Sequence, residues 1–183
     1  MSAPTPEPDA STAGSLAITV VGHDRPGIIA QTADALAAVG MNLEDSSMTL
    51  LRGHFAMTLI CVGASSPAEV EAALAPLADG SLTVDVREVP DEPEALREGR
   101  PYLVTVHGAD RLGIVARLAG VVAAAGGNIT DLTTRLAGEL YVLVAEVDLP
   151  VAADEADLGR RLTKAGAELG VEVHLRPVER DDL

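Results

Sequence analysis

Apolar and polar residues follow strand-like and helix-like periods in turn along this chain. A continuous, β-branched apolar run at residues 15–22 predicts a strand. Apolar residues then recur at helical spacing from Ile28 to Val39, and Gly40 follows them as a C-terminal helix signal. Two further apolar runs meet around Arg52 and Gly53 and predict a pair of strands joined by a turn.

A second helix and a last strand complete this half of the chain. Ser66 is placed to cap the helix, with Pro67 at its first position, and alternation over residues 81–89 predicts the strand. The second half repeats the whole order, with elements predicted at residues 101–108, 111–127, 128–136, 139–149, 153–170 and 171–178.

Each half therefore reads β-α-β-β-α-β, the ferredoxin-like order. Right-handed crossovers place both helices on one face of a four-stranded antiparallel sheet, so the predicted class is α+β. The pattern divides the chain into a disordered tail at 1–14, a first domain at 15–89, an acidic linker at 90–100 and a second domain at 101–179.

Composition and charge narrow the possible partners. Aromatic residues make up 2% of the chain and Trp is absent, so the cores must consist of aliphatic side chains and few aromatic platforms are available for single-stranded nucleic acid. The formal net charge is −15, which argues against direct binding of nucleic acid or of anionic membrane surfaces.

The cellular location is predicted from what the sequence lacks. No run approaches 18 apolar residues, and the N-terminal segment lacks the basic and apolar regions of a signal peptide. The single cysteine, Cys61, lies in an apolar run, where we expect a buried thiol that forms no internal disulfide. These features together predict a cytoplasmic protein.

The segment between the first strand and first helix of each half is repeated most closely. Residues 22–30 read GHDRPGIIA and residues 108–116 read GADRLGIVA. Asp24 and Asp110 precede a helix, where a carboxylate either caps the helix or binds a ligand. A glycine at the start of a helix costs about 0.5–1 kcal/mol relative to alanine, and it is tolerated where a backbone or a ligand approaches closely.

An asparagine is repeated at the same offset, just after the glycine that ends each helix. Asn42 and Asn128 are interpreted either as turn residues or as ligand-binding amides. We expect the asparagine and the helix N-terminus to face one small cavity at the end of the sheet. Free helix N–H groups attract a carboxylate and an aspartate attracts an ammonium group, so this cavity would suit an α-amino acid.

The D-R-x-G segment, the Ala-rich helix and the following G-x-N resemble the signature of the ACT domain family, a family of small ligand-binding regulatory modules. The two copies span residues 16–178, and a tandem pair is similar to regulators of the glycine cleavage system repressor type. The resemblance implies an amino-acid-binding regulatory protein that acts through domain and subunit interfaces, in transcriptional or metabolic control, as a homodimer or other homo-oligomer. It implies no enzymatic activity and no cofactor.

The resemblance also implies site residues, because paired ACT domains bind an amino acid where the first loop of one domain meets the helix of its neighbour. The residues carried over to the first site are Gly22, His23, Asp24, Pro26, Gly27, Ile28 and Asn42. Those of the second site are Gly108, Ala109, Asp110, Gly113, Ile114 and Asn128. The second copy has Ala109 and Leu112 in place of His23 and Pro26, so we expect that site to be weaker, differently selective or structural. Arg25 and Arg111 are interpreted as solvated surface residues, with ligand binding as the alternative.

Catalytic and metal chemistry finds little support in the sequence. The four histidines, His23, His54, His107 and His174, occupy different predicted elements, and none has metal-ligand spacing with another His or Cys. Phosphate-loop, nucleophile-elbow and C-x-x-C motifs are absent. We therefore predict no enzyme and no metal site. The alternative to amino acid sensing is a protein–protein interaction module without a metabolite ligand.

Overall fold

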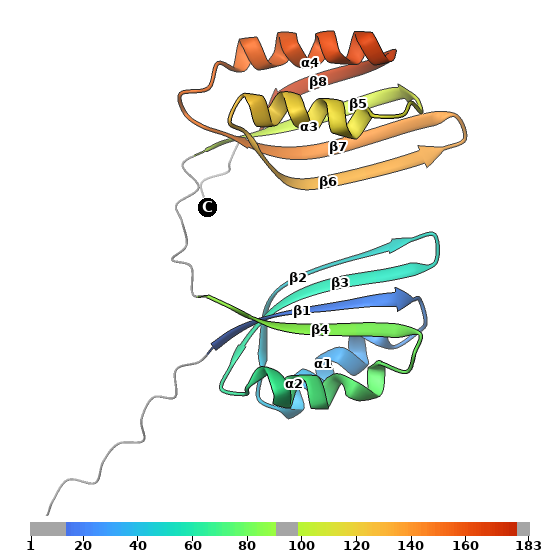
Figure 1. Cartoon of the computed structure of the whole chain (residues 1–183), viewed down its shortest axis with the longest axis vertical. Coiled ribbons are helices and arrows are strands. Elements are labelled where there is room, and N and C mark those ends of the chain that lie inside the picture. Colours follow the sequence, from blue (N-terminus) through green and yellow to red (C-terminus); the bar gives the residue numbers. More distant parts are fainter. Residues whose placement is uncertain (1–13, 91–98, 179–183) are drawn as a thin grey trace, which may run out of the picture. The chain divides into compact units, whose positions relative to one another are not determined.

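A computed structural model describes residues 14–90 and 99–178, and the chain divides into two compact units between residues 93 and 94 (Figure 1). Residues 1–13 of the predicted tail and 91–98 of the predicted linker lie outside the described residues, whereas Gly14 and Arg100 each begin a strand. Among the helices of the described residues, none is both long and apolar enough to cross a bilayer.

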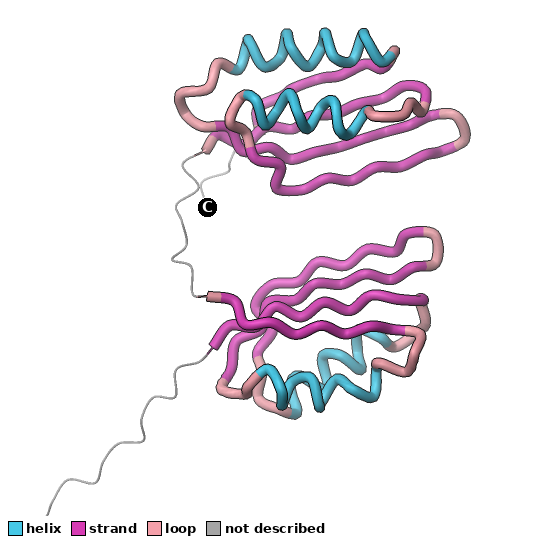
Figure 2. Tube along the Cα trace, in the orientation of Figure 1, coloured by secondary structure: helices cyan, strands magenta, loops and turns pink. Residues whose placement is uncertain are grey.

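The first unit is a four-stranded sheet with its helices on one face (Figure 2). Its strand order is β2-β3-β1-β4, and all neighbouring strands are antiparallel. In chain order its elements are β1 (Gly14–His23), α1 (Ile28–Ala38), β2 (Asn42–Leu51), β3 (His54–Gly63), α2 (Pro67–Leu74), the 3₁₀ turn η1 (Ala75–Leu77) and β4 (Leu82–Val89).

The second unit repeats this architecture. Its strand order is β6-β7-β5-β8, again with antiparallel neighbours. Its elements are β5 (Arg100–Ala109), α3 (Ile114–Ala124), β6 (Asn128–Ala137), β7 (Leu140–Leu149), α4 (Glu155–Leu169) and β8 (Val171–Pro177). The predicted fold class, two α+β domains of the ferredoxin-like type, is confirmed.

Both cores lie between the helices and one face of each sheet. Leu16, Ile18 and Val20 alternate along β1 and are at most 2% exposed, because the helices cover this face. The residues between them face the other way and are partly exposed. Cys61 lies in the same core, as predicted, and burial raises the pKa of its thiol.

The start of α2 follows the predicted capping chemistry. The Ser66 hydroxyl accepts a hydrogen bond from the backbone N–H of Glu69, and the Glu69 carboxylate accepts one from the backbone N–H of Ser66. This reciprocal pair is a capping box. In the second unit Asp154 caps α4 by accepting from the backbone N–H of Asp157.

Candidate functional site

The turn that leads into the first helix of each unit has a backbone conformation that requires glycine. Gly27 and Gly113 are the N-cap residues of α1 and α3, with φ of 91° and 90°. Residues with a Cβ are strained in this region. Of the two alternatives for Asp24 and Asp110, the helix cap is wrong, because no side chain of the described residues accepts a hydrogen bond at either N-cap. The glycines are explained by the turn conformation, without a closely approaching group.

Asp24 and Asp110 are instead exposed on this turn. The backbone N–H of Asp24 donates to the carbonyl of Gly53 at 3.0 Å, which ties the turn to the β2–β3 hairpin. Within residues 14–90 and 99–178, no partner contacts the Asp24 carboxylate through a hydrogen bond or an ion pair. Its charge is therefore available to a ligand.

Gly22 and Gly108 are structural positions. A Cβ on Gly22 would overlap the Ser81 carbonyl oxygen and approach Leu82 Cα at 2.8 Å, since β4 runs directly beside it. A Cβ on Gly108 would lie 3.0 Å from Val171 Cα on β8. These glycines permit the edge strand to pair at the end of β1 or β5.

The other residues of the predicted sites divide between core and surface. Ile28 and Ile114 are 2% exposed and belong to the two cores, so only their backbone is available to a ligand. His23, Pro26 and Ala109 are exposed. The predicted sets thus contain exposed turn residues together with the residues that position the turn.

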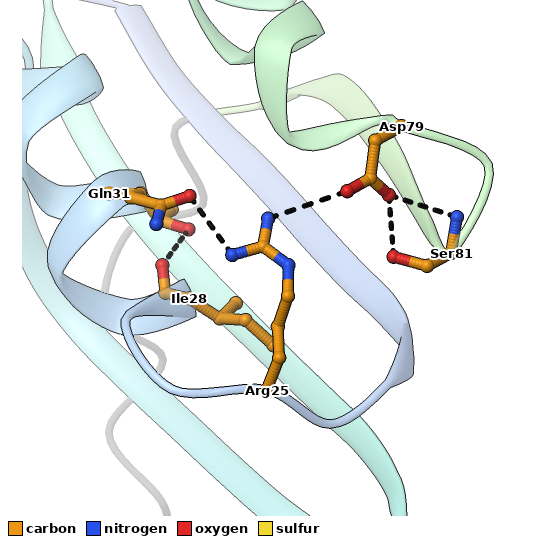
Figure 3. A network of polar contacts seen from close by, with 6 residues as sticks. Arg25, Ile28, Gln31, Asp79 and Ser81 are labelled. Carbon is orange, nitrogen blue, oxygen red and sulfur yellow. Dashed lines mark hydrogen bonds and ion pairs between the residues drawn. The ribbon is translucent and has the colours of Figure 1, made fainter.

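The guanidinium of Arg25 lies between Gln31 on α1 and Asp79 in the segment that precedes β4 (Figure 3). Its Nη1 donates to Gln31 Oε1 at 3.2 Å, and its Nη2 lies 3.8 Å from Asp79 Oδ2. Hydrogen bonds from Ser81, together with the Arg25 charge, hold the pKa of Asp79 below its usual value. The prediction of a purely solvated Arg25 is wrong, because this guanidinium fixes the turn against α1 and the β4 segment.

In the second unit, the helix after the turn is linked to the segment before the last strand without the turn arginine. Arg117 stands at the position of Gln31 on the helix and donates to Glu168 at 2.7 Å, which lowers the pKa of Glu168. Arg111 is exposed and has no polar partner in the part of the chain that the structure describes. Arg25 and Arg111 therefore have different environments despite their identical places in the repeat.

The two units also differ in the residue that pairs with the glycine near the end of β1 or β5. Gly108 pairs with Tyr141, whereas Gly22 pairs with Phe55, which is 2% exposed. Burial raises the pKa of Tyr141, and the neighbouring Asp110 carboxylate raises it further. The second turn therefore has a phenol near its aspartate where the first has a buried phenyl ring.

Asn42 and Asn128 lie at the other end of their sheets. Asn42 pairs with Val62, whereas His23, next to the turn, pairs with His54. Eight residues of β3 separate these two levels, or about 25 Å at roughly 3.3 Å per residue. The prediction that the asparagine and the turn of one domain face one cavity is wrong, because the helix returns the chain to the level at which β1 begins.

Asn128 lines an open depression at its own end of the second sheet. The cavity has a volume of about 470 Å³, and Gly99, Gly126, Asp148 and Pro150 contribute to its walls. The register of β6 against β7 places this end away from the Asp110 turn, as in the first unit.

Both sheets end in an edge strand with exposed apolar side chains. On β2, Leu43, Met48 and Leu50 are 41–50% exposed, and Ile29 on the adjoining helix is 52% exposed. Leu132 and Leu136 on β6 repeat the pattern. Unpaired apolar edge strands favour pairing with another strand.

Two of the four histidines come together on the second sheet, which the sequence analysis missed. His107 on β5 and His174 on β8 both contact Glu172, although their spacing in the sequence is not that of a metal-binding motif. The signal lay in strand order, since β5 and β8 are neighbours in a ferredoxin-like sheet. In the first unit, His23 and His54 lie edge to face with ring centroids 6.3 Å apart.

Comparison with known proteins places both halves in one family. The ACT domain model matches residues 15–87 and 100–176. Two curated relatives are UPF0237 protein MK1213 of Methanopyrus kandleri, 44% identical over 72 residues, and UPF0237 protein MJ1558 of Methanocaldococcus jannaschii, 42% identical over 72 residues. Each alignment covers 39% of this chain and 80% of the relative.

Solved structures match the tandem arrangement as well. An unknown protein from Galdieria sulphuraria superposes with a TM-score of 0.78 at 27% identity, covering 91% of this chain and 99% of that one. A putative glycine cleavage system transcriptional repressor superposes with a TM-score of 0.68 at 20% identity, covering 93% and 100%. The similarity to the putative repressor shows a shared fold and no more.

Proposed function

Because the chain belongs to the ACT domain family, we propose that it is a regulatory protein that binds a small amino acid and catalyses no reaction. The observation that supports this most directly is the uncapped, exposed turn before α1. Among the described residues, the Asp24 carboxylate has no partner and no side chain caps the adjoining helix start. The protein is proposed to act in the cytoplasm, in the control of amino acid metabolism.

This turn has the two charges that an amino acid requires. The first backbone N–H groups of a helix attract anions, so those of α1 would bind the ligand's carboxylate. The Asp24 side chain would bind its ammonium group at the edge of the same turn. Arg25 would act indirectly, because its contacts with Gln31 and Asp79 fix the turn.

The repeated asparagine enters such a site only from another domain. Since Asn42 lies about 25 Å from the turn of its own domain, we propose that β2 pairs antiparallel with β2 of a second chain. Antiparallel pairing sets the start of one strand beside the end of the other. Asn42 of one chain would then lie near the β2–β3 hairpin of its partner, to which Asp24 is bonded. The exposed apolar residues of β2 support this pairing.

The two domains are proposed to differ in affinity or selectivity. The first turn is fixed by Arg25, whereas the second has an exposed Arg111, Leu112 in place of Pro26, and Tyr141 near Asp110. A fixed turn loses less conformational freedom when a ligand binds. We therefore assign the tighter site to the first domain.

A panel of the twenty amino acids, tested by thermal shift and then by calorimetry on the full chain, tests the proposal. A ligand at 100 times its Kd adds about 2.7 kcal/mol of stability, which is a shift of several degrees for a protein of this size. Asn42→Ala should abolish the tighter binding event, and the matched variant Asn128→Ala should leave it intact. If no amino acid shifts the melting temperature, the sensor proposal fails and the interaction module without a metabolite ligand takes its place.

A further inference from the structure

The second sheet carries a cluster of two imidazoles and one carboxylate outside the turn. Glu172 Oε2 lies 2.9 Å from His107 Nε2, and Glu172 Oε1 lies 3.0 Å from His174 Nε2. The three ligand atoms all lie within 4.8 Å of one another. The imidazole rings are stacked, with centroids 5.5 Å apart and 24° between their planes. Both Nε2 atoms are thus directed at the same carboxylate.

The strand register builds this cluster. His107 pairs with Glu172 and Thr105 pairs with His174, so the three ligands occupy neighbouring positions on adjacent strands. Val106 and Val173 are buried in the core, and because side chains alternate along a strand, the cluster lies on the face away from the helices. Its side chains are 39–63% exposed, so an ion and its remaining water ligands would have room there.

The first sheet provides an internal comparison. The positions that correspond to His107, Glu172 and His174 in the register of β1 and β4 are Val21, Thr83 and Asp85. Neither valine nor threonine replaces an imidazole or a carboxylate as a metal ligand. The cluster is therefore a property of the second domain and is not explained by the shared fold.

We propose that His107, Glu172 and His174 bind a divalent first-row transition metal ion. Zn²⁺ takes imidazole nitrogen and carboxylate oxygen at roughly 2.0–2.2 Å, so neighbouring ligand atoms lie about 3.3–3.6 Å apart around a tetrahedral ion. The two nitrogen–oxygen distances, 2.9 and 3.0 Å, are shorter than this by about 0.3–0.7 Å, so the ion would enter with small movements of exposed side chains. Two histidines with one carboxylate, and coordination positions left for water, suit zinc, nickel, cobalt or iron, and the imidazoles disfavour magnesium and calcium.

Calorimetric titration of the full, untagged chain with Zn²⁺ in a non-coordinating buffer tests the site. We expect one zinc ion per chain and no measurable heat from Mg²⁺. His107→Gln, His174→Gln and Glu172→Gln should each weaken zinc binding by more than about tenfold, since the loss of even an outer partner of a metal site usually costs about 10–100-fold. The matched control is His54→Gln, an exposed histidine next to another histidine in the first unit, which should leave the affinity unchanged.

Nitrogen-15 NMR of the imidazoles supplies a second readout that does not depend on how well a variant folds. On addition of Zn²⁺ to the wild-type chain, the Nε2 resonances of His107 and His174 should move together while those of His23 and His54 stay in place. Equal weakening by His54→Gln, or zinc shifts spread over all four histidines, would overturn the proposal. In that case Glu172 would serve only as a hydrogen-bond acceptor for the two rings. The proposal does not depend on amino acid binding at the turns.

Discussion

Alanine substitutions at two glycines of the second domain should change its stability in opposite directions. Gly113 has φ of 90° at the N-cap of α3, whereas Gly120 lies inside the same helix. A Cβ added at either position meets no atom within 4 Å, so neither substitution makes a clash. Backbone conformation is therefore the main difference between the two.

The expected magnitudes follow from this geometry. Alanine in the left-handed region costs about 1–2 kcal/mol, so Gly113→Ala should destabilise the domain by that amount. Alanine is favoured over glycine inside a helix by up to about 1 kcal/mol, so Gly120→Ala should stabilise it. The difference between the two variants should then be about 1–3 kcal/mol.

Native-state hydrogen exchange, measured on peptides from β5 and β7, reports how often the second domain opens within the full chain. Gly113→Ala should speed exchange of their most protected amides by roughly 5–30-fold, and Gly120→Ala should slow it. If Gly113→Ala leaves exchange unchanged, the turn does not require a positive φ. The glycine would then need another explanation, such as close approach of a ligand.

Three further results are expected. The stability that Asp79 contributes through its lowered pKa is present at neutral pH and is lost as the pH falls below about 4. Ser81→Ala should reduce this acid-dependent loss, as measured by denaturant unfolding at neutral and at acidic pH, and an unchanged loss would contradict the assigned cause. The thiol of Cys61 should react with Ellman's reagent only as fast as the first domain opens, and rapid reaction of the native chain would contradict its burial. Ser66→Ala should cost about 1 kcal/mol by removing the helix cap, measured by thermal unfolding, with no loss expected if the cap is not formed in solution.

Much of the fold follows from the sequence because its local signals agree. Apolar period, the turn at Arg52 and Gly53, and the Ser66–Pro67 helix start all recur in the structure close to their predicted places. Each of these signals acts over a few residues. Their order then leaves the ferredoxin-like sheet as the arrangement that right-handed crossovers permit.

The errors concern relations between distant residues. The expectation that Asn42 shares one end of the sheet with the Asp24 turn is wrong, because a helix antiparallel to β1 returns the chain to the opposite end. Aspartate is usual at a helix N-cap, so residue preference leaves the cap open as an alternative for Asp24, whereas Gly27 in a left-handed turn occupies that position. Residue preference acts over a few positions, whereas both relations depend on the path of the chain through the domain.

The histidine cluster illustrates what strand register adds. His107 and His174 are far apart in sequence, and they meet because β5 and β8 are neighbours with a particular alignment. Alternation predicts that both face away from the core. The alignment itself depends on the loops around α4, which the sequence pattern does not determine.

The most direct test of the proposed amino acid site is complementation between two defective chains. Asp24→Ala and Asn42→Ala, each made in a chain that also carries Asn128→Ala, should bind no ligand at the first site when each is pure. Mixing and re-equilibrating equal amounts should restore about a quarter of the wild-type first sites, because half of the twofold dimers are mixed and each mixed dimer regenerates one of its two sites. Calorimetry that recovers this fraction would establish a site shared between chains, and a mixture as inactive as its components would contradict it.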